Sequence, residues 1–193
     1  MNAQHIKGLN VMSLKQSRKI ASADKILYDP GEHRIKALTL GGPIGADAKV
    51  ILFSDIKNIG SDGVMVESED SIKTLTQAGK NIERMVKDNL YLINTSVMTE
   101  DGVGLGKIVD FQFDPTSGNV SEVEISQGPI MDVKEGRKKV AGDDIVRIGK
   151  NTTIVKGYID EKLASEKKGG LQGIMRGMQE KITDTKKKIN LPS

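Results

Sequence analysis

The chain has 193 residues, with 29 basic and 26 acidic side chains and a formal net charge of +3. It contains no cysteine, which excludes a disulfide framework and thiolate chemistry, and no apolar run is long enough for a membrane-spanning helix. Aromatic residues make up only 3% of the chain, so its cores must depend on Ile, Val and Leu, which favour strands. These features predict a cytoplasmic protein with one or two small domains.

Residues 9–68 form the first predicted domain. Apolar alternation and short apolar runs predict strands over 25–28, 34–40, 50–53, 56–59 and 64–66. Asp29-Pro30-Gly31 favours a turn between the first two strands. Ser61-Asp62-Gly63 favours a hairpin turn, because glycine adopts the positive φ that such turns need.

Residues 69–91 predict a linker helix, because five apolar residues fall on one helical stripe. They are Ile72, Leu75, Ile82, Met85 and Val86. Ser68 and Ser71 offer hydroxyl groups that can cap the start of this helix.

Residues 92–156 form the second predicted domain. Its strands are predicted over 107–113, 120–125, 145–148 and 153–155, with a turn at 114–119. Many short strands separated by regular turns predict a small barrel in each domain. The side chains expected in the two cores are Val50, Leu52, Ile56, Ile108, Phe111, Val123 and Ile145.

The glycine-rich segment from Gly102 to Lys107 raises the question of a phosphate-binding loop. Lys107 is followed by Ile108 instead of Ser or Thr, and the glycine spacing fits neither the P-loop nor the dinucleotide fingerprint. We therefore interpret the segment as a turn that enters a strand, where glycine supplies backbone freedom.

The titratable residues show no catalytic or metal-binding pattern. His5 and His33 are the only histidines, and His33 lies in a polar turn and is expected to be exposed. Asp143-Asp144 matches Ser54-Asp55 in the first domain, and a repeated acidic position of this kind favours a turn cap. We predict no catalytic, cofactor-binding or metal-ligating residue and no cofactor, so the chain is not expected to be an enzyme.

Residues 157–193 predict a helical, basic C-terminal tail. Residues 161–193 carry eight basic and four acidic side chains, whereas the rest of the chain carries 21 and 22. The candidate partner-binding residues are Leu171, Ile174, Met175, Met178, Lys181, Ile182, Lys186, Lys187 and Lys188. This amphipathic segment is expected to dock on a protein, a second copy of the chain or an anionic membrane surface; the structural alternative is a solvated tail.

The chain repeats itself at an offset of 85 to 89 residues. The matching segments are 11–13 with 97–99, 29–30 with 114–115, and 53–60 with 141–149. A period of this length indicates a duplicated small domain rather than a solenoid.

The segments 104–115, 120–125 and 143–149 resemble the PRC-barrel family, which is named for the photosynthetic reaction-centre H subunit and is related to the C-terminal barrel of a ribosome-maturation factor. The first domain shares the Asp-Pro turn and the Asp-Ile segment but lacks the glycine that precedes Lys107 in the second. The resemblance implies a mainly β fold of two tandem small PRC-type barrels, with a linker helix and a C-terminal amphipathic helix.

The resemblance also implies an adaptor, because the family consists mainly of binding modules and brings no catalytic residue set. We therefore predict a non-catalytic binding protein that acts through protein–protein contacts with an unidentified partner or a second copy. The alternatives are an RNA- or ribosome-associated processing factor, and a protein held at the inner membrane face by its basic tail. The near-neutral body disfavours nucleic-acid binding.

Overall fold

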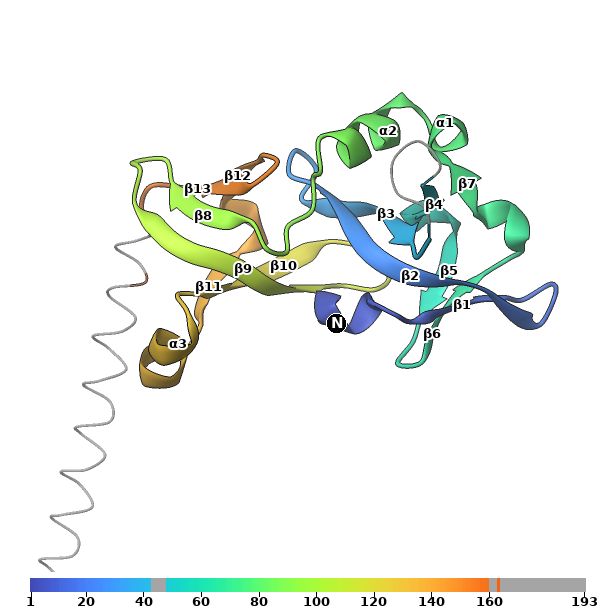
Figure 1. Cartoon of the computed structure of the whole chain (residues 1–193), viewed down its shortest axis with the longest axis horizontal. Helices are drawn as coiled ribbons and strands as arrows, with labels where there is room; N and C mark the ends of the chain where they lie inside the picture. Colours follow the sequence, from blue (N-terminus) through green and yellow to red (C-terminus); the bar gives the residue numbers. More distant parts are fainter. Residues whose placement is uncertain (43–47, 160–162, 164–193) are drawn as a thin grey trace, which may run out of the picture. The chain divides into compact units, whose positions relative to one another are not determined.

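The computed structural model describes residues 1–42, 48–159 and 163, which form a mainly β protein with two curved sheets and few helices (Figure 1). Both sheets lie within the compact unit Met1–Gly157. The mainly β fold predicted from the sequence is confirmed, and the sheets curl in the manner of a half-barrel.

The first sheet has seven strands in the order β5-β6-β1-β2-β3-β4-β7. They are β1 (Asn10–Ser13), β2 (Arg18–Asp29), β3 (Arg34–Leu40), β4 (Lys49–Leu52), β5 (Ile56–Ile59), β6 (Gly63–Val66) and β7 (Lys73–Thr74). β1 and β6 run parallel, and the other neighbours run antiparallel. The five strands predicted for this region overlap β2 to β6.

The second sheet has six strands in the order β11-β10-β9-β8-β13-β12. They are β8 (Ser96–Thr99), β9 (Gly104–Phe113), β10 (Val120–Ser126), β11 (Lys138–Ala141), β12 (Ile145–Ile148) and β13 (Thr152–Val155). The four predicted strands fall within β9, β10, β12 and β13, whereas β8 and β11 were not predicted.

Six strands of the first sheet follow the same order as the six strands of the second. The series β5-β6-β1-β2-β3-β4 corresponds to β12-β13-β8-β9-β10-β11, and each sheet has one parallel pair, β1–β6 or β8–β13. A 3-10 turn precedes the outer strand in both, at η3 (Phe53–Asp55) and η5 (Gly142–Asp144). The sequence repeat therefore coincides with a repeat in strand topology.

Corresponding turns join β2 to β3 and β9 to β10. Asp29 Oδ1 accepts a hydrogen bond from the N–H of Gly31 at 2.9 Å, and Asp114 Oδ1 accepts one from the N–H of Thr116 at 2.8 Å. The N–H groups of Ser117 and Thr116 hold the pKa of the Asp114 carboxyl below its usual range. An aspartate that binds the backbone ahead of it favours a turn, so both turns begin at this residue.

The linker predicted as one helix over 69–91 contains two short helices, α1 (Leu75–Ala78) and α2 (Lys80–Lys87). Gly79 between them has a φ of +96°, which interrupts the helical backbone. Thr74 starts α1 through a capping box with Gln77.

The linker helices pack on the first sheet beside β4 (Figure 1). Their buried residues join strand residues in one apolar cluster of Leu27, Ala37, Ala48, Val50, Leu75, Ile82 and Met85. Ser68, predicted to cap the linker helix, instead accepts a hydrogen bond from the N–H of Asp70 in the 3-10 turn η4 (Glu69–Ser71).

Most of the predicted core is buried. The side chains with at most 2% exposure are Val50, Ile108, Phe111, Val123 and Ile145. Leu52 and Ile56 are only half-buried, because they flank the η3 turn where the chain leaves β4 for the outer strand β5.

Backbone hydrogen bonds join the two sheets where β3 and β10 begin. The N–H of Ile35 donates to the Gly118 carbonyl at 2.8 Å, and the N–H of Val120 donates to the His33 carbonyl at 3.1 Å. At the N-terminus, the amino group of Met1 donates to the Phe113 carbonyl at 2.7 Å. These bonds hold the N-terminus and the start of β3 against the ends of β9 and β10 that flank their turn.

Candidate functional site

The short helix α3 (Pro129–Glu135) is inserted between β10 and β11 of the second sheet (Figure 1). Gly128 before it and Gly136 after it have φ values of +107° and +77°, which other residues rarely adopt. Pro129 occupies the first helical position, where a backbone N–H has no acceptor within the helix, so the absence of this group in proline costs no hydrogen bond. Local sequence therefore defines both ends of this helix.

Asp132 ties α3 to the end of β10. Its Oδ2 accepts a hydrogen bond from Ser126 Oγ at 2.6 Å, and its Oδ1 accepts one from the N–H of Gln127 at 3.1 Å. The N–H of Gly128 donates to Ser126 Oγ at 3.0 Å, and Arg137 Nε lies 3.8 Å from Asp132 Oδ2. These bonds satisfy polar groups at the start of the helix and fix its position on the strand.

Ile130 and Val133 of α3 remain in water, with 82% and 91% of their surface exposed. Their i, i+3 spacing places both side chains on one face of the helix. Single exposed apolar residues are ordinary on protein surfaces, whereas exposed apolar groups that adjoin one another mark a candidate interaction site. We refer to these two residues as the α3 apolar pair.

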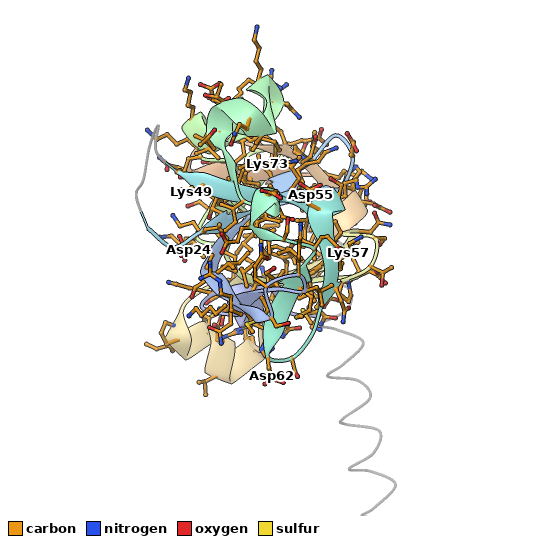
Figure 2. The ribbon with its side chains drawn as sticks, turned by 90° about the vertical axis from the view of Figure 1, so that its right-hand side faces the viewer. Asp24, Lys49, Asp55, Lys57, Asp62 and Lys73 are labelled. Atoms are coloured by element: carbon orange, nitrogen blue, oxygen red, sulfur yellow. The ribbon has the colours of Figure 1, made fainter. Side chains whose placement is uncertain are left out.

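The acidic residues at the matched turn positions form ion pairs. Lys73 Nζ lies 2.7 Å from Asp55 Oδ2, and Figure 2 shows these two side chains next to each other. In the second sheet, Lys156 Nζ lies 3.1 Å from Asp144 Oδ1, and Asp144 is buried. Each aspartate ends a 3-10 turn and binds a lysine further along the chain, which indicates a structural role.

The expectation that His33 is exposed is wrong. His33 is half-buried, and its Nδ1 lies 3.1 Å from the carbonyl oxygen of Gly142 and 3.3 Å from the Tyr28 hydroxyl. Because a carbonyl oxygen can only accept, the contact with Gly142 is a hydrogen bond in the tautomer that carries the proton on Nδ1. Burial, followed by the charges of Asp143 and Asp29, raises the pKa of the Tyr28 phenol. His33 thus joins the two sheets, a contact that the polarity of its own turn does not indicate.

Gly106, directly before Lys107, allows β9 to approach β10. Gly106 has a φ of +126°, and a Cβ atom placed on it would lie 2.2 Å from the carbonyl oxygen of Ser126. The segment was predicted to be a turn that enters a strand, and the close packing of Gly106 in the sheet agrees with this structural role.

Within residues 1–42 and 48–159, no group of three or more His, Asp or Glu side chains is placed to hold a metal ion. His5 is exposed, and its Nε2 lies 2.6 Å from the Ser61 carbonyl oxygen. Across the part of the chain that the structure describes, no helix combines the length and apolar composition needed to cross a membrane.

The predicted partner-binding residues of the tail all lie outside the described residues. They are Leu171, Ile174, Met175, Met178, Lys181, Ile182, Lys186, Lys187 and Lys188. Their role in docking therefore stays a prediction.

The sequence interpretation did not single out α3, although signals for it exist. Gly128 and Pro129 mark its start, Gly136 marks its end, and Ile130 and Val133 have helical spacing. Seven residues are too few for periodicity to separate a helix from a loop, and exposure depends on neighbours distant in sequence.

Comparison with known proteins places a PRC-barrel domain at residues 91–162, a range that contains all six strands of the second sheet. One copy is found, so the resemblance predicted from sequence is confirmed for the second domain alone. No curated protein matches the chain.

Proposed function

We propose that this chain is a non-catalytic adaptor that binds a protein partner and consists of two tandem PRC-type barrels. The PRC-barrel match covers one copy, residues 91–162. A diverged second copy within residues 9–68 is supported by the shared strand order and by the parallel pairs β1–β6 and β8–β13. Because the family is one of binding modules, the function must come from a surface of this particular chain.

The docking surface in this proposal is the α3 apolar pair. The observation that carries it is that Asp132 anchors the helix through two hydrogen bonds while Ile130 and Val133 remain almost fully exposed. Full burial of an aliphatic side chain contributes roughly 1.5–3 kcal/mol. A partner that covers both side chains gains this energy without ordering the helix first, because α3 is already formed.

The partner chemistry follows from the helix. Two apolar side chains spaced i, i+3 fit a shallow apolar groove, which is the usual way in which a short amphipathic helix is bound. Exposed Lys134 lies next to Val133 in sequence, so the rim of that groove is expected to carry an acidic residue.

Site-specific photocrosslinking tests this function. Benzoylphenylalanine is introduced at Ile130 or Val133 of the full chain in its native cell, and crosslinked proteins are identified by mass spectrometry. Matched control positions are Val103 and Val146, whose exposures of 42% and 46% also allow contact with solvent. We expect a discrete crosslinked partner from the α3 positions and none from the controls.

The identified partner is then purified and titrated. Ile130→Asp and Val133→Asp should each weaken the dissociation constant by about tenfold or more, because a charge replaces a buried aliphatic group. Val146→Asp should leave it unchanged. A crosslinked product with twice the mass of the chain identifies a second copy as the partner. Equal crosslinking at all four positions, or unchanged affinity in both α3 variants, would contradict the proposal.

A further inference from the structure

A cleft of about 450 Å³ lies between the two sheets, inside the unit Met1–Gly157. It is formed by the N-terminal 3-10 turn η1 (Ala3–Ile6), by β2, by the end of the linker and by β9. Its floor consists of the buried side chains of Ala3, Ile26 and Phe111. This volume is within the range of small-molecule sites, which combine an apolar floor with a few polar groups.

Hydrogen bonds to β9 hold two walls of the cleft. Gln4 donates through its backbone N–H to Asp110 Oδ1 at 3.0 Å and through its side chain to the Val109 carbonyl at 2.6 Å. From the segment that follows the linker, the N–H of Asn94 donates to the Ile108 carbonyl at 2.8 Å. The cleft is therefore formed before any ligand arrives.

A bulge in β2 turns consecutive residues toward the cleft. The pairing of β2 with β3 shifts register between Ala23 and Ile26, so the usual alternation of side chains is broken there. As a result Asp24, Lys25 and Ile26 all line the cleft. Bulges of this kind re-aim side chains and are frequent next to functional sites.

The buried hydroxyl of Thr39 supports the bulge. Thr39 Oγ1 accepts a hydrogen bond from the Lys25 N–H at 3.1 Å and donates to the Lys25 carbonyl at 3.4 Å. These bonds replace the strand pairing that the register shift removes, so the bulge is a built feature of the sheet.

The charged groups of the cleft form no ion pair within the described part of the chain. There, Lys7, Asp24 and Lys25 take part in no ion pair, and Lys25 Nζ lies 4.8 Å above the centre of the Tyr91 ring. Burial, followed by the charge of Asp24, raises the pKa of the Tyr91 phenol. The cleft thus carries two ammonium groups, one carboxylate and a neutral phenol around an apolar floor.

We propose that this cleft binds a small organic anion with an apolar body, such as an aryl or alkyl carboxylate. The apolar body covers Ile26 and Phe111 and lies beside the Tyr91 ring, where it displaces water from apolar surface. The anionic group binds Lys7 and Lys25, whose ammonium groups donate charge-assisted hydrogen bonds. Asp24 accepts a hydrogen bond from a donor on the same ligand and disfavours ligands with a second negative charge.

The test follows backbone amide shifts by NMR on the full chain during titration with four probes. Phenylacetate has both the body and the carboxylate, acetate has only the carboxylate, benzyl alcohol has only the body, and phenethylamine has the opposite charge. We expect saturable shifts with phenylacetate at Lys7, Ile26 and Tyr91, with a dissociation constant on the order of millimolar for so small a ligand. The other three probes should bind about tenfold more weakly or not at all.

Charge-removing variants locate the anion. Lys7→Gln and Lys25→Gln should each weaken phenylacetate binding by about tenfold, because one charge-assisted hydrogen bond is lost. Lys57→Gln is the matched control, since Lys57 is exposed on β5 and Figure 2 shows it at the opposite edge of the view from Asp24. Circular dichroism checks that each variant folds.

Three results would overturn the inference. They are the absence of saturable phenylacetate shifts at the cleft, equal affinity for phenethylamine, and unchanged affinity in both lysine variants that fold normally. None of these results bears on the α3 apolar pair, so the inference and the proposed function are tested independently.

Discussion

Arg34 and Asn119 face each other in an isolated antiparallel bridge between the two sheets. They are 85 residues apart, which is the offset that separates Asp29 from Asp114 in the repeated turns. Their neighbours exchange reciprocal hydrogen bonds, Ile35 to Gly118 and Val120 to His33. Equivalent residues that meet in this way indicate an approximate two-fold relation between the repeats at this bridge.

The side chains next to this bridge break the symmetry. Phe53 covers Gly118, and His33 binds the carbonyl of Gly142. Phe53 and Gly142 correspond in the repeat, as do His33 and Gly118. The first repeat therefore supplies both rings and the second repeat supplies both glycines, so the repeats have diverged to fit each other.

Gly118→Ala should destabilise the protein more than Gly102→Ala. Both glycines have a positive φ, +75° and +86°, so each alanine is strained by roughly 1–2 kcal/mol. Only at Gly118 would the new Cβ lie 2.8 Å from the Phe53 ring, whereas Gly102 has open space. The additional clash should raise the loss in unfolding free energy by about 1–3 kcal/mol, measured by urea denaturation. Equal losses would show that Phe53 does not pack against the turn.

Ile108→Ala should lower the free energy of unfolding by roughly 2–5 kcal/mol. Ile108 is fully buried in β9, and truncation leaves a cavity in the second sheet. Leu14→Ala is the control, because Leu14 is 49% exposed and its loss should be within about 0.5 kcal/mol. Chemical denaturation of both variants measures the two losses. A loss for Ile108→Ala as small as that for Leu14→Ala would show that Ile108 is not in a tightly packed core.

Thr39→Val should cost about 1–3 kcal/mol of stability, because the Lys25 N–H loses its partner at the β2 bulge. Thr39→Ser keeps the hydroxyl and should lose much less. The valine variant should also bind phenylacetate more weakly, since Asp24 and Lys25 are no longer held toward the cleft. Denaturation and the NMR titration measure the two effects separately, and normal stability in Thr39→Val would contradict the bulge argument.

Stability should fall above about pH 10, the ordinary pKa of a tyrosine in an unfolded chain. Burial raises the pKa values of Tyr28 and Tyr91, so above this pH the unfolded state releases protons that the folded state retains. The contribution of these tyrosines to the free energy of unfolding is therefore fully present below their pKa in the unfolded chain, and it declines as the pH rises toward their pKa in the folded protein. Tyr28→Phe should flatten this decline without abolishing it, because Tyr91 contributes in the same direction. Urea denaturation between neutral pH and pH 11 provides the measurement, and an unchanged slope in Tyr28→Phe would contradict the assignment.

Local sequence predicted the features that depend on neighbours along the chain. The Asp29-Pro30-Gly31 turn and the Ser61-Asp62-Gly63 hairpin are where they were expected, because aspartate and glycine favour these backbone conformations by themselves. Matching segments in the two halves also indicated a duplicated domain, and one strand order does occur twice, although the PRC-barrel match covers only residues 91–162. These inferences needed only short-range chemistry and the comparison of the chain with itself.

The tertiary structure decided what depends on distant contacts. Gly79 divides the predicted linker helix into two short helices. Each of them forms because its apolar side chains are buried in the cluster beside β4. The polar turn around His33 gave no sign that this side chain would contact the carbonyl oxygen of Gly142, 109 residues away. The cleft needs η1, β2, the linker and β9 together, and its three consecutive lining residues depend on a register shift between strands. Such features arise from pairing between segments far apart in the chain, which the periodicity of one segment does not encode.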